Sequence, residues 1–254
     1  TNGLRLTLLT SRQSIKGEKL VYLGKLRHTA LEISGLFFAI GLIAAASAAT
    51  APALTPIHDP TQRLDLPGLS ILPPKGENWF ITPLPPKADN PAVPLVAFTK
   101  RLREEPPTRP ADARVVYARV TAYDLRDPRM QAPDAFETVT AFLHWLRQWE
   151  KHTGEMITGR QRLIGFDATP DDSFGAKCAQ YRRVTELSGL GQFQKSVFIL
   201  TTRGWFCLHP HWPQYMIDAG YTQVHLKGEE PVLLDVEIEP FLRSPLFTAT
   251  RPMP

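Results

Sequence analysis

One thiol and two imidazoles fall at alternate positions in the C-terminal half of the chain, at Cys207, His209 and His211. Cys and His are the ligands that zinc and copper prefer, and alternate residues of a strand point to one face of a sheet. A metal site is therefore one hypothesis for this cluster. Against it, Pro210 interrupts the alternation, and no second Cys/His pair has metal-ligand spacing.

The favoured interpretation of the same stretch needs no metal. Two prolines, at 210 and 213, stop a strand from continuing and predict a stiff turn. In that turn we expect a histidine to pack on Trp205 or Trp212. No cofactor is expected.

The two cysteines of the chain, Cys178 and Cys207, predict a disulfide. Each lies in a strand-like segment, and the turn-forming sequence 188–191 separates the two segments. A hairpin centred near Gln192 sets the cysteines opposite each other, at bridging distance. An even number of cysteines in an exported chain is most simply paired. Free catalytic thiols are the alternative.

A catalytic thiol needs a histidine that a carboxylate or amide orients. His225 and Asp218 are candidates for these roles, but such residues occur in any chain of this size. The sequence has no Gly-x-Ser-x-Gly, no His-Glu-x-x-His, no phosphate-binding glycine loop and no dinucleotide fingerprint. We therefore predict no catalytic residue.

An acidic stretch at 166–173 carries Asp167, Asp171, Asp172 and Ser173, whose oxygens can in principle bind calcium. It lacks the spacing and the glycine of an EF-hand, so a solvated turn is the favoured interpretation.

Other charged and aromatic residues are predicted to be structural. The charged pairs Arg182–Arg183 and Glu229–Glu230 are typical of an ordinary surface. Aromatic residues at helix and strand spacing usually belong to the core. Those expected in the core, with a ligand groove as the alternative, are Trp145, Trp149, Trp205 and Phe206.

The order of the predicted elements is strands, a helix, further strands and a last helix, which indicates an α+β domain with an antiparallel sheet and two segregated helices. A first helix begins with Asp134 as N-cap and Glu137 in a capping box, and ends at Gly154. The second covers 231–242, with a break near Pro240. The strands are expected at 69–72, 78–82, 93–102, 114–125, 161–166, 177–187, 196–209 and 216–226.

The N-terminal part reads as an export signal. No charged residue lies between Glu32 and His58, basic residues precede this gap, and small residues fill 44–49. This order predicts a leader over 1–48 that is cleaved between Ala48 and Ala49. Because the first methionine is Met130, residues 1–20 are interpreted as an extension of the gene model. If the segment 33–57 is not cleaved, it anchors the chain in the inner membrane with the C-terminal domain outside.

Cleavage leaves a proline-rich extended arm over 49–77 and a single α+β domain over 78–254. The sequence carries a net charge of +4, but residues 1–48 hold six Lys/Arg against two Asp/Glu, so the remainder is neutral. A neutral domain lacks the basic excess of a nucleic-acid-binding protein. We expect no nucleic-acid partner, and a membrane contact only through 33–57.

Four stretches resemble a group of uncharacterised bacterial envelope proteins. They include a Cys-x-x-Tyr pattern at 178–181, a Gly-x-x-Cys-x-His-Pro pattern at 204–210 and a Glu-x-Phe-Leu-x-Ser pattern ending at Ser244, with Tyr221-Thr222-Gln223 between them. The resemblance covers about the last 80 residues and implies a secreted or lipid-anchored protein of unknown activity. Lipid-anchored relatives need a cysteine at the cleavage site, where this chain has alanines.

The order of elements is also similar to the sandwich of the PsbP family of photosynthetic extrinsic subunits. That resemblance implies an α/β/α sandwich and no particular function.

Three functional hypotheses follow. The leading one is a non-catalytic exported protein, periplasmic or otherwise extracytoplasmic, that binds or helps to assemble an envelope protein or complex, with the arm lying along the partner. The second is a metal-binding or thiol-dependent periplasmic enzyme that uses Cys207, His209 and His211. The third is a membrane-anchored accessory subunit of an envelope complex.

Overall fold

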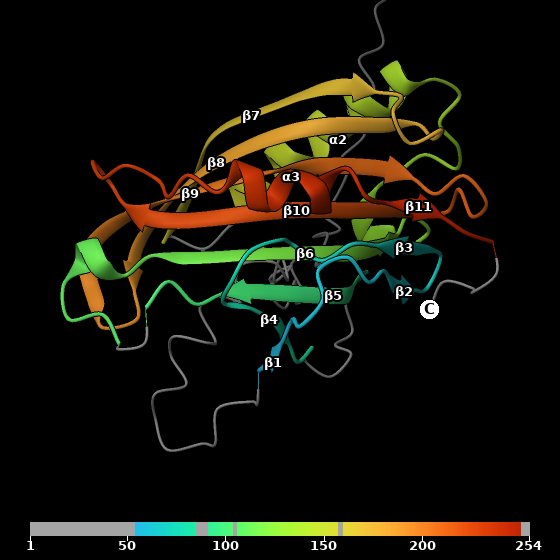
Figure 1. The fold of residues 1–254 in the computed structure, drawn as a ribbon. Coiled ribbons are helices and arrows are strands. Elements are labelled where there is room, and N and C mark those ends of the chain that lie inside the picture. The colour runs from blue at the N-terminus through green and yellow to red at the C-terminus, as the bar shows by residue number, and fades with distance from the viewer. Residues whose placement is uncertain (1–53, 85–90, 104–105, 157–159, 250–254) are drawn as a thin grey trace, which may run out of the picture.

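A large antiparallel sheet forms the centre of the computed structural model, which describes residues 54–84, 91–103, 106–156 and 160–249. Its eight strands run in the order β1-β4-β5-β6-β10-β9-β8-β7 (Figure 1). In that order they are β1 (Thr55–Pro56), β4 (Trp79–Thr82), β5 (Ala92–Lys100), β6 (Val115–Asp124), β10 (Tyr215–Leu226), β9 (Phe193–Leu208), β8 (Cys178–Leu190) and β7 (Gln161–Asp171).

Each face of the sheet is covered by its own layer. Helix α2 (Val139–Met156) lies behind the sheet in Figure 1, and helix α3 (Asp235–Leu242) lies in front of it. A small sheet in the order β11-β3-β2 joins α3 on the front face; its strands are β2 (Leu64–Leu66), β3 (Leu69–Ile71) and β11 (Leu246–Phe247). The predicted α+β fold with two segregated helices is thus confirmed.

Two separate hydrophobic clusters hold these layers. In front, Leu69, Ile71 and Phe241 pack with Val116 and Phe98 of the sheet. Behind, the apolar side of α2 packs on the sheet through Phe142, Trp145, Leu146, Trp149, Tyr123 and Phe206. Strands covered on both faces bury both sets of side chains, which explains why all but the last residue of β10 are buried.

Helix α2 begins later than predicted. Thr138, and not Asp134, caps it, because the Thr138 hydroxyl accepts a hydrogen bond from Ala141 N–H at 3.1 Å. Gly154 does not end the helix, which continues to Met156. A Cβ on Gly154 would lie 2.9 Å from the Leu163 side chain, so this glycine permits the close approach of α2 to β7.

Helix α3 is shorter than the predicted 231–242 and retains Pro240 in its last turn. Glu237 fastens it to the sheet, since its Oε2 accepts hydrogen bonds from Trp79 Nε1 and Lys100 Nζ, each at 2.7 Å. Lys100 Nζ also lies 5.6 Å from the centre of the Trp79 ring. One carboxylate therefore joins α3 to β4 and β5.

The described part of the predicted arm packs on its own domain. Leu69 and Ile71 are fully buried in the front cluster. Arg63 donates hydrogen bonds to the carbonyl oxygens of Ser70 and Ser244, at 2.7 and 2.5 Å, which ties the arm to the C-terminal segment. Residues 64–71 are thus a layer of the fold.

The predicted leader, the cleavage site at Ala48–Ala49 and most of the 33–57 segment lie outside the described residues. Within the ranges that the structure describes, no helix is both long and apolar enough to cross a membrane.

Strand β7 forms one edge of the large sheet. Its pairing with β8 shifts register between Leu163 and Gly165, and Pro170 lies near its end. The side chain of Ile164, at the bulge, is half exposed.

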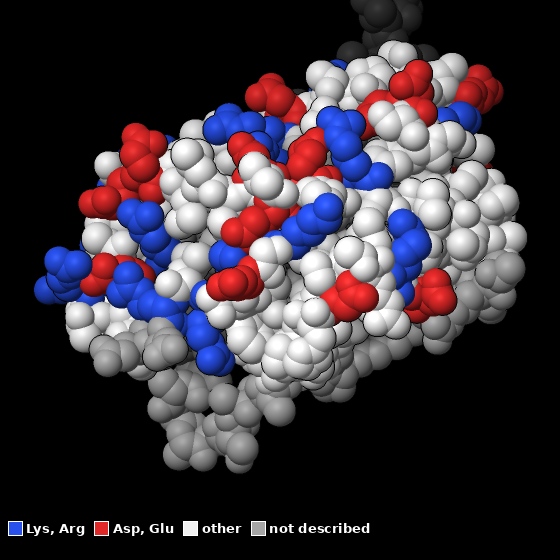
Figure 2. All heavy atoms as spheres, viewed as in Figure 1, with Lys and Arg blue, Asp and Glu red and all other residues white. Residues whose placement is uncertain are grey.

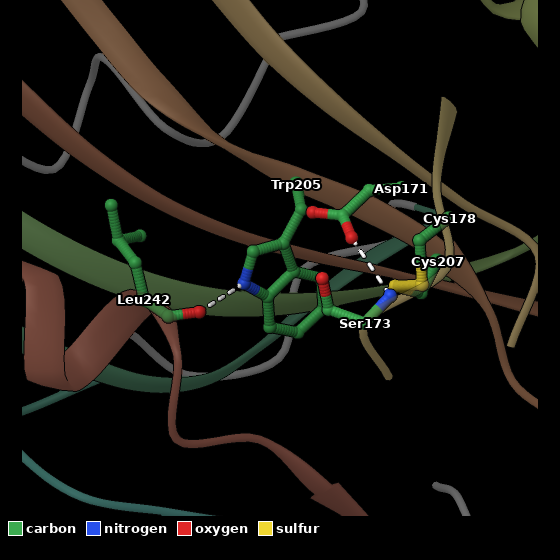
Figure 3. Close-up of a disulfide and its surroundings, with 6 residues drawn as sticks. All are labelled: Asp171, Ser173, Cys178, Trp205, Cys207 and Leu242. Carbon is green, nitrogen blue, oxygen red and sulfur yellow. Dashed lines mark hydrogen bonds between the residues drawn. A yellow bond between two sulfur atoms is a disulfide. The ribbon is translucent and has the colours of Figure 1, made fainter. Parts of the chain in front are cut away.

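The predicted disulfide is present in the β8–β9 hairpin. Cys178 lies directly opposite Cys207 in the strand register, and the two sulfur atoms are bonded. Both residues are completely buried. Figure 3 draws the bond beside Trp205, whose Nε1 donates to Leu242 O at 2.8 Å, so the bridge lies on the α3 side of the sheet.

Replacing both cysteines by alanine should lower the free energy of unfolding by about 3–4 kcal/mol, because the bond closes a loop of sequence separation 29 in the unfolded chain. Urea unfolding of the two proteins measures this loss. Wild-type protein that is unfolded with a reductant present is the control and should lose a similar amount. A loss below about 1 kcal/mol in both would contradict the prediction.

Candidate functional site

The structure gives structural roles to Cys207 and His209, whereas the side chain of His211 is exposed. Cys207 is in the disulfide, and no free cysteine occurs in the chain. His209 is completely buried; its Nδ1 accepts hydrogen bonds from the backbone N–H groups of His211 and Trp212, at 3.1 and 3.2 Å. Its Nε2 lies 2.8 Å from Gly68 O. Because Nδ1 is an acceptor twice, Nε2 carries the proton and donates it to Gly68.

This arrangement leaves no atom of Cys207 or His209 free for a metal or for catalysis. Among the residues with described positions, no three His, Cys, Asp or Glu side chains gather in a way that could hold a metal ion. The ring of His209 packs on Trp212 at 4.6 Å between centroids, as the favoured sequence interpretation predicts. The histidine therefore fastens the β9–β10 loop to the turn between β2 and β3.

The other sequence candidates are also placed. His225 lies with Nδ1 3.1 Å from Leu226 O. The acidic stretch is only partly a turn: β7 continues to Asp171, which accepts a hydrogen bond from Ser173 N at 2.9 Å. The four aromatic residues expected in the core are all buried: Trp145, Trp149, Trp205 and Phe206.

A pocket of about 970 Å³ opens at one end of the sheet, where three loops meet. We call it the loop pocket. Its walls are formed by residues within 125–136, 172–177 and 208–214, and its apolar surface includes Leu125, Phe136 and Leu208. Its volume is in the range of small-molecule and peptide sites.

Each wall of the loop pocket is fixed by a specific contact. Trp145 Nε1 of α2 donates to Gln131 O at 3.2 Å and holds the first wall. The disulfide at Cys178 fixes the base of the second wall, and His209 fixes the third. Lys177 Nζ donates to Phe136 O at 2.5 Å and joins the second wall to the first. His209 and Pro210 of the Gly-x-x-Cys-x-His-Pro pattern therefore line this pocket, and Cys178 of the Cys-x-x-Tyr pattern directly follows its second wall.

A cluster of charged side chains and a tyrosine lies between α2 and the sheet. Arg119 of β6 donates to Asp218 Oδ2 at 2.9 Å, and Tyr181 Oη of β8 donates to Asp218 Oδ1 at 2.8 Å. Arg183 of β8 donates to Glu150, which is the only buried acidic residue on α2 with a described side chain. These five residues are called the buried ionic cluster. Each arginine is paired with one carboxylate, so the formal charges of the cluster sum to zero.

Burial within this cluster is nearly complete. The side chains of Asp218, Glu150 and Arg119 are 0, 3 and 8 % exposed. Arg183 is 16 % exposed, so its prediction as ordinary surface charge is wrong: strand alternation turns it toward α2. Arg182, the next residue, faces the other side.

Glycines make room for the cluster. Across the sheet, Tyr181, Gly204, Gly220 and Arg119 lie side by side in one row of the strand register. A Cβ on Gly220 would lie 2.6 Å from Tyr181 Oη. The Tyr181 side chain can therefore extend over β9 to Asp218 on β10 only because the two glycines leave no side chain in its way.

Burial and neighbouring charges both shift the pKa values in this cluster. Burial raises the pKa of Glu150, although Arg183 opposes this. Burial lowers the pKa of Arg119, but Asp218 and the neighbouring tyrosines together outweigh it, and the net pKa lies well above the ordinary value. Burial and the nearby Asp218 raise the pKa of Tyr181 well above its ordinary value. At neutral pH the arginines are therefore charged and the tyrosine is protonated.

Sequence reasoning overlooked this cluster, although two signals were available. Glu150 falls on the apolar face of α2, four residues after Leu146. Arg119 alternates with apolar residues in β6, as a buried residue would. Neither signal identifies the partner, because the partners come from other strands.

Acidification should destabilise the protein through His209. Burial lowers its pKa below the ordinary 6.5, so its stabilising effect is complete above about pH 6.5 and is lost as the pH falls. Between pH 7 and 5, the free energy of unfolding should fall by up to about 1.4 kcal/mol per pH unit from this group. His209→Gln should remove that part of the slope, whereas the exposed control His152→Gln should retain it. An unchanged slope in His209→Gln would refute this assignment.

Replacing one member of the Glu150–Arg183 pair should lower the free energy of unfolding by about 3–5 kcal/mol, because the other member is left as a buried charge without a partner. We expect this loss for Glu150→Leu in urea unfolding. The double variant Glu150→Leu with Arg183→Met replaces the pair by apolar groups and should recover most of the loss. A double variant no more stable than Glu150→Leu would show that the pair is not coupled.

Comparison with known proteins gives little further information. No family model and no curated protein sequence matches the chain. Among solved structures, it is similar to the crystal structure of LpqN, a protein involved in cell envelope biogenesis of Mycobacterium tuberculosis. The identity is 13 %, the TM-score is 0.37, and the alignment covers 78 % of this chain and 92 % of LpqN. A similarity at this level carries no argument about function.

Proposed function

We propose that this chain is an exported, non-catalytic protein that binds a protein partner in the cell envelope, and that the loop pocket is its binding site. The observation that carries the proposal is the pocket itself, whose three walls are each fixed by a separate contact. A preformed site loses less conformational entropy on binding than a mobile one.

The compartment is inferred from the disulfide and the leader-like sequence. Disulfides persist in oxidising compartments, and the bridge here lies in the core of the fold. The charge-free segment before His58 supplies the expected export signal. Both features favour a domain outside the cytoplasm.

A binding role fits the chemistry of the site better than catalysis. The thiols are bonded to each other, and both ring nitrogens of His209 are engaged by backbone groups. The basic residues on the pocket walls, Arg126 and Lys177, are also engaged, the first with Asp124 and the second with Phe136 O. These groups orient the walls and leave an apolar floor for a partner.

The surface charge favours a protein partner over nucleic acid. Figure 2 shows acidic and basic side chains interspersed over the α3 face. Many are paired, as in Arg203–Asp235, Arg243–Glu239 and Lys227–Glu186. A nucleic-acid-binding face would instead carry a basic stripe.

Site-specific photo-crosslinking in the native envelope tests the proposal. A photoreactive phenylalanine analogue replaces Ala135, an exposed residue on the pocket wall. The matched control places it at Val236, which is 88 % exposed on α3. We expect a discrete cross-linked adduct from position 135 alone.

A pocket-filling change completes the experiment. Ala176→Trp, on the opposite wall, should abolish the adduct from position 135 while the protein keeps its unfolding midpoint within a few degrees. An adduct from 236 alone, no adduct from 135, or an adduct that survives filling of the pocket would each reject the loop pocket as the binding site.

A further inference from the structure

The buried ionic cluster contains two hydrogen-bond donors for which the described part of the chain supplies no acceptor. Arg119 Nε and Arg183 Nε are buried, and neither has an acceptor among the described residues. The other ends of both guanidinium groups donate to Asp218 and Glu150. Leaving a buried charged N–H without an acceptor is costly, so such groups in native proteins are normally paired with protein or with ordered water.

Nearby tyrosine rings do not replace the missing acceptors. The Arg119 guanidinium carbon lies 6.0 Å from the centre of the Tyr117 ring, and that of Arg183 lies 5.8 Å from the Tyr181 ring. These distances suit an attraction between the cation and the ring face. An N–H group needs an acceptor atom at about 3 Å.

A third donor lies between the two arginines. Thr202 and Thr222 are paired in the strand register, both are buried, and their hydroxyl oxygens lie 2.9 Å apart. In such a pair one hydroxyl donates to the other, which leaves one O–H directed elsewhere. The register places Thr202 directly beside Arg183, and Thr222 one row from Arg119 on the same face.

We propose that the buried ionic cluster is an internal water site, in which ordered water accepts hydrogen bonds from Arg119 Nε and Arg183 Nε beside the Thr202–Thr222 pair. A buried water in proteins makes two to four hydrogen bonds, of which its oxygen accepts up to two, and the donors of this site can supply those two.

The charge of the cluster selects water over an ion. Arg119 and Arg183 are balanced by Asp218 and Glu150, so the site has no net charge to hold an anion. A cation is excluded because the unsatisfied atoms are all donors. The ligand is therefore a small, neutral hydrogen-bond acceptor, and a water molecule has these properties.

A high-resolution crystal structure of the protein tests this site. We expect a peak at about 2.7–3.2 Å from each Nε, at full occupancy. A second crystal, soaked in bromide, should show no anomalous peak there. Absence of the water peaks, or a bromide peak in their place, would overturn the proposal.

Magnetic resonance in solution provides an independent test. The Nε–H groups of Arg119 and Arg183 should each show a cross-peak to long-lived water. Arg63 and Arg129 provide controls, since they are partly buried and their Nε–H groups donate directly to Ser70 Oγ and Asp127 Oδ1, at 3.0 and 2.9 Å. Cross-peaks that are no stronger than those of the controls would refute the site.

The double variant Thr202→Val and Thr222→Val removes the hydroxyl groups with little change of shape. It should weaken the water peak or cross-peak at least twofold and leave the Tyr181–Asp218 hydrogen bond intact. An unchanged peak would show that the threonines do not belong to the site. If this variant does not fold, the measurements on the wild-type protein still decide.

Discussion

The register between β8 and β9 determines which side chains meet on each face of the sheet, and a covalent bond fixes it where Cys178 lies opposite Cys207. A slip by one residue would send every side chain of a strand to the opposite face. With the observed register, Trp205 joins the front core, while Tyr181 faces α2. The ionic cluster and the frame of the loop pocket both depend on this alignment.

The loop pocket and the buried ionic cluster differ in kind. The loop pocket lies where strands end, and its walls are loops that rigid neighbours hold in place. The ionic cluster lies in the middle of the sheet, under α2, and its members are fixed by strand pairing. A pocket at the rim can receive a partner, whereas a cluster under a helix acts on the stability and orientation of that helix. The loop pocket and the buried ionic cluster therefore lie at different positions along the strands.

Much of the fold could be predicted from the sequence because local signals and tertiary contacts agree. Runs of strand-forming residues bounded by turns predict the long strands. A hairpin between two of them predicts the disulfide of Cys178 with Cys207. The start of α2 was misplaced because Asp134 and Thr138 are both good caps, and the choice depends on how 133–137 packs at the loop pocket. The burial of Arg183 was missed because strand propensity does not say what covers each face.

The hydrogen-bond partners in the candidate site cannot be predicted from neighbouring residues in the sequence, for a similar reason. The sequence singles out Cys207 and His209, but nothing near them in sequence indicates Gly68 as the acceptor. The contact spans 141 positions along the chain. Similarly, Arg119 and Asp218 meet only because β6 pairs with β10. Long-range strand pairing is the information that a single sequence lacks.

The outer strand β7 has a consequence for the behaviour of the protein at high concentration. A long, regular border strand offers its backbone groups to a second molecule and invites fibrous assembly. The bulge at Leu163–Gly165 and the missing amide proton of Pro170 interrupt that row of backbone groups. Sheet extension between neighbouring copies through β7 is therefore discouraged.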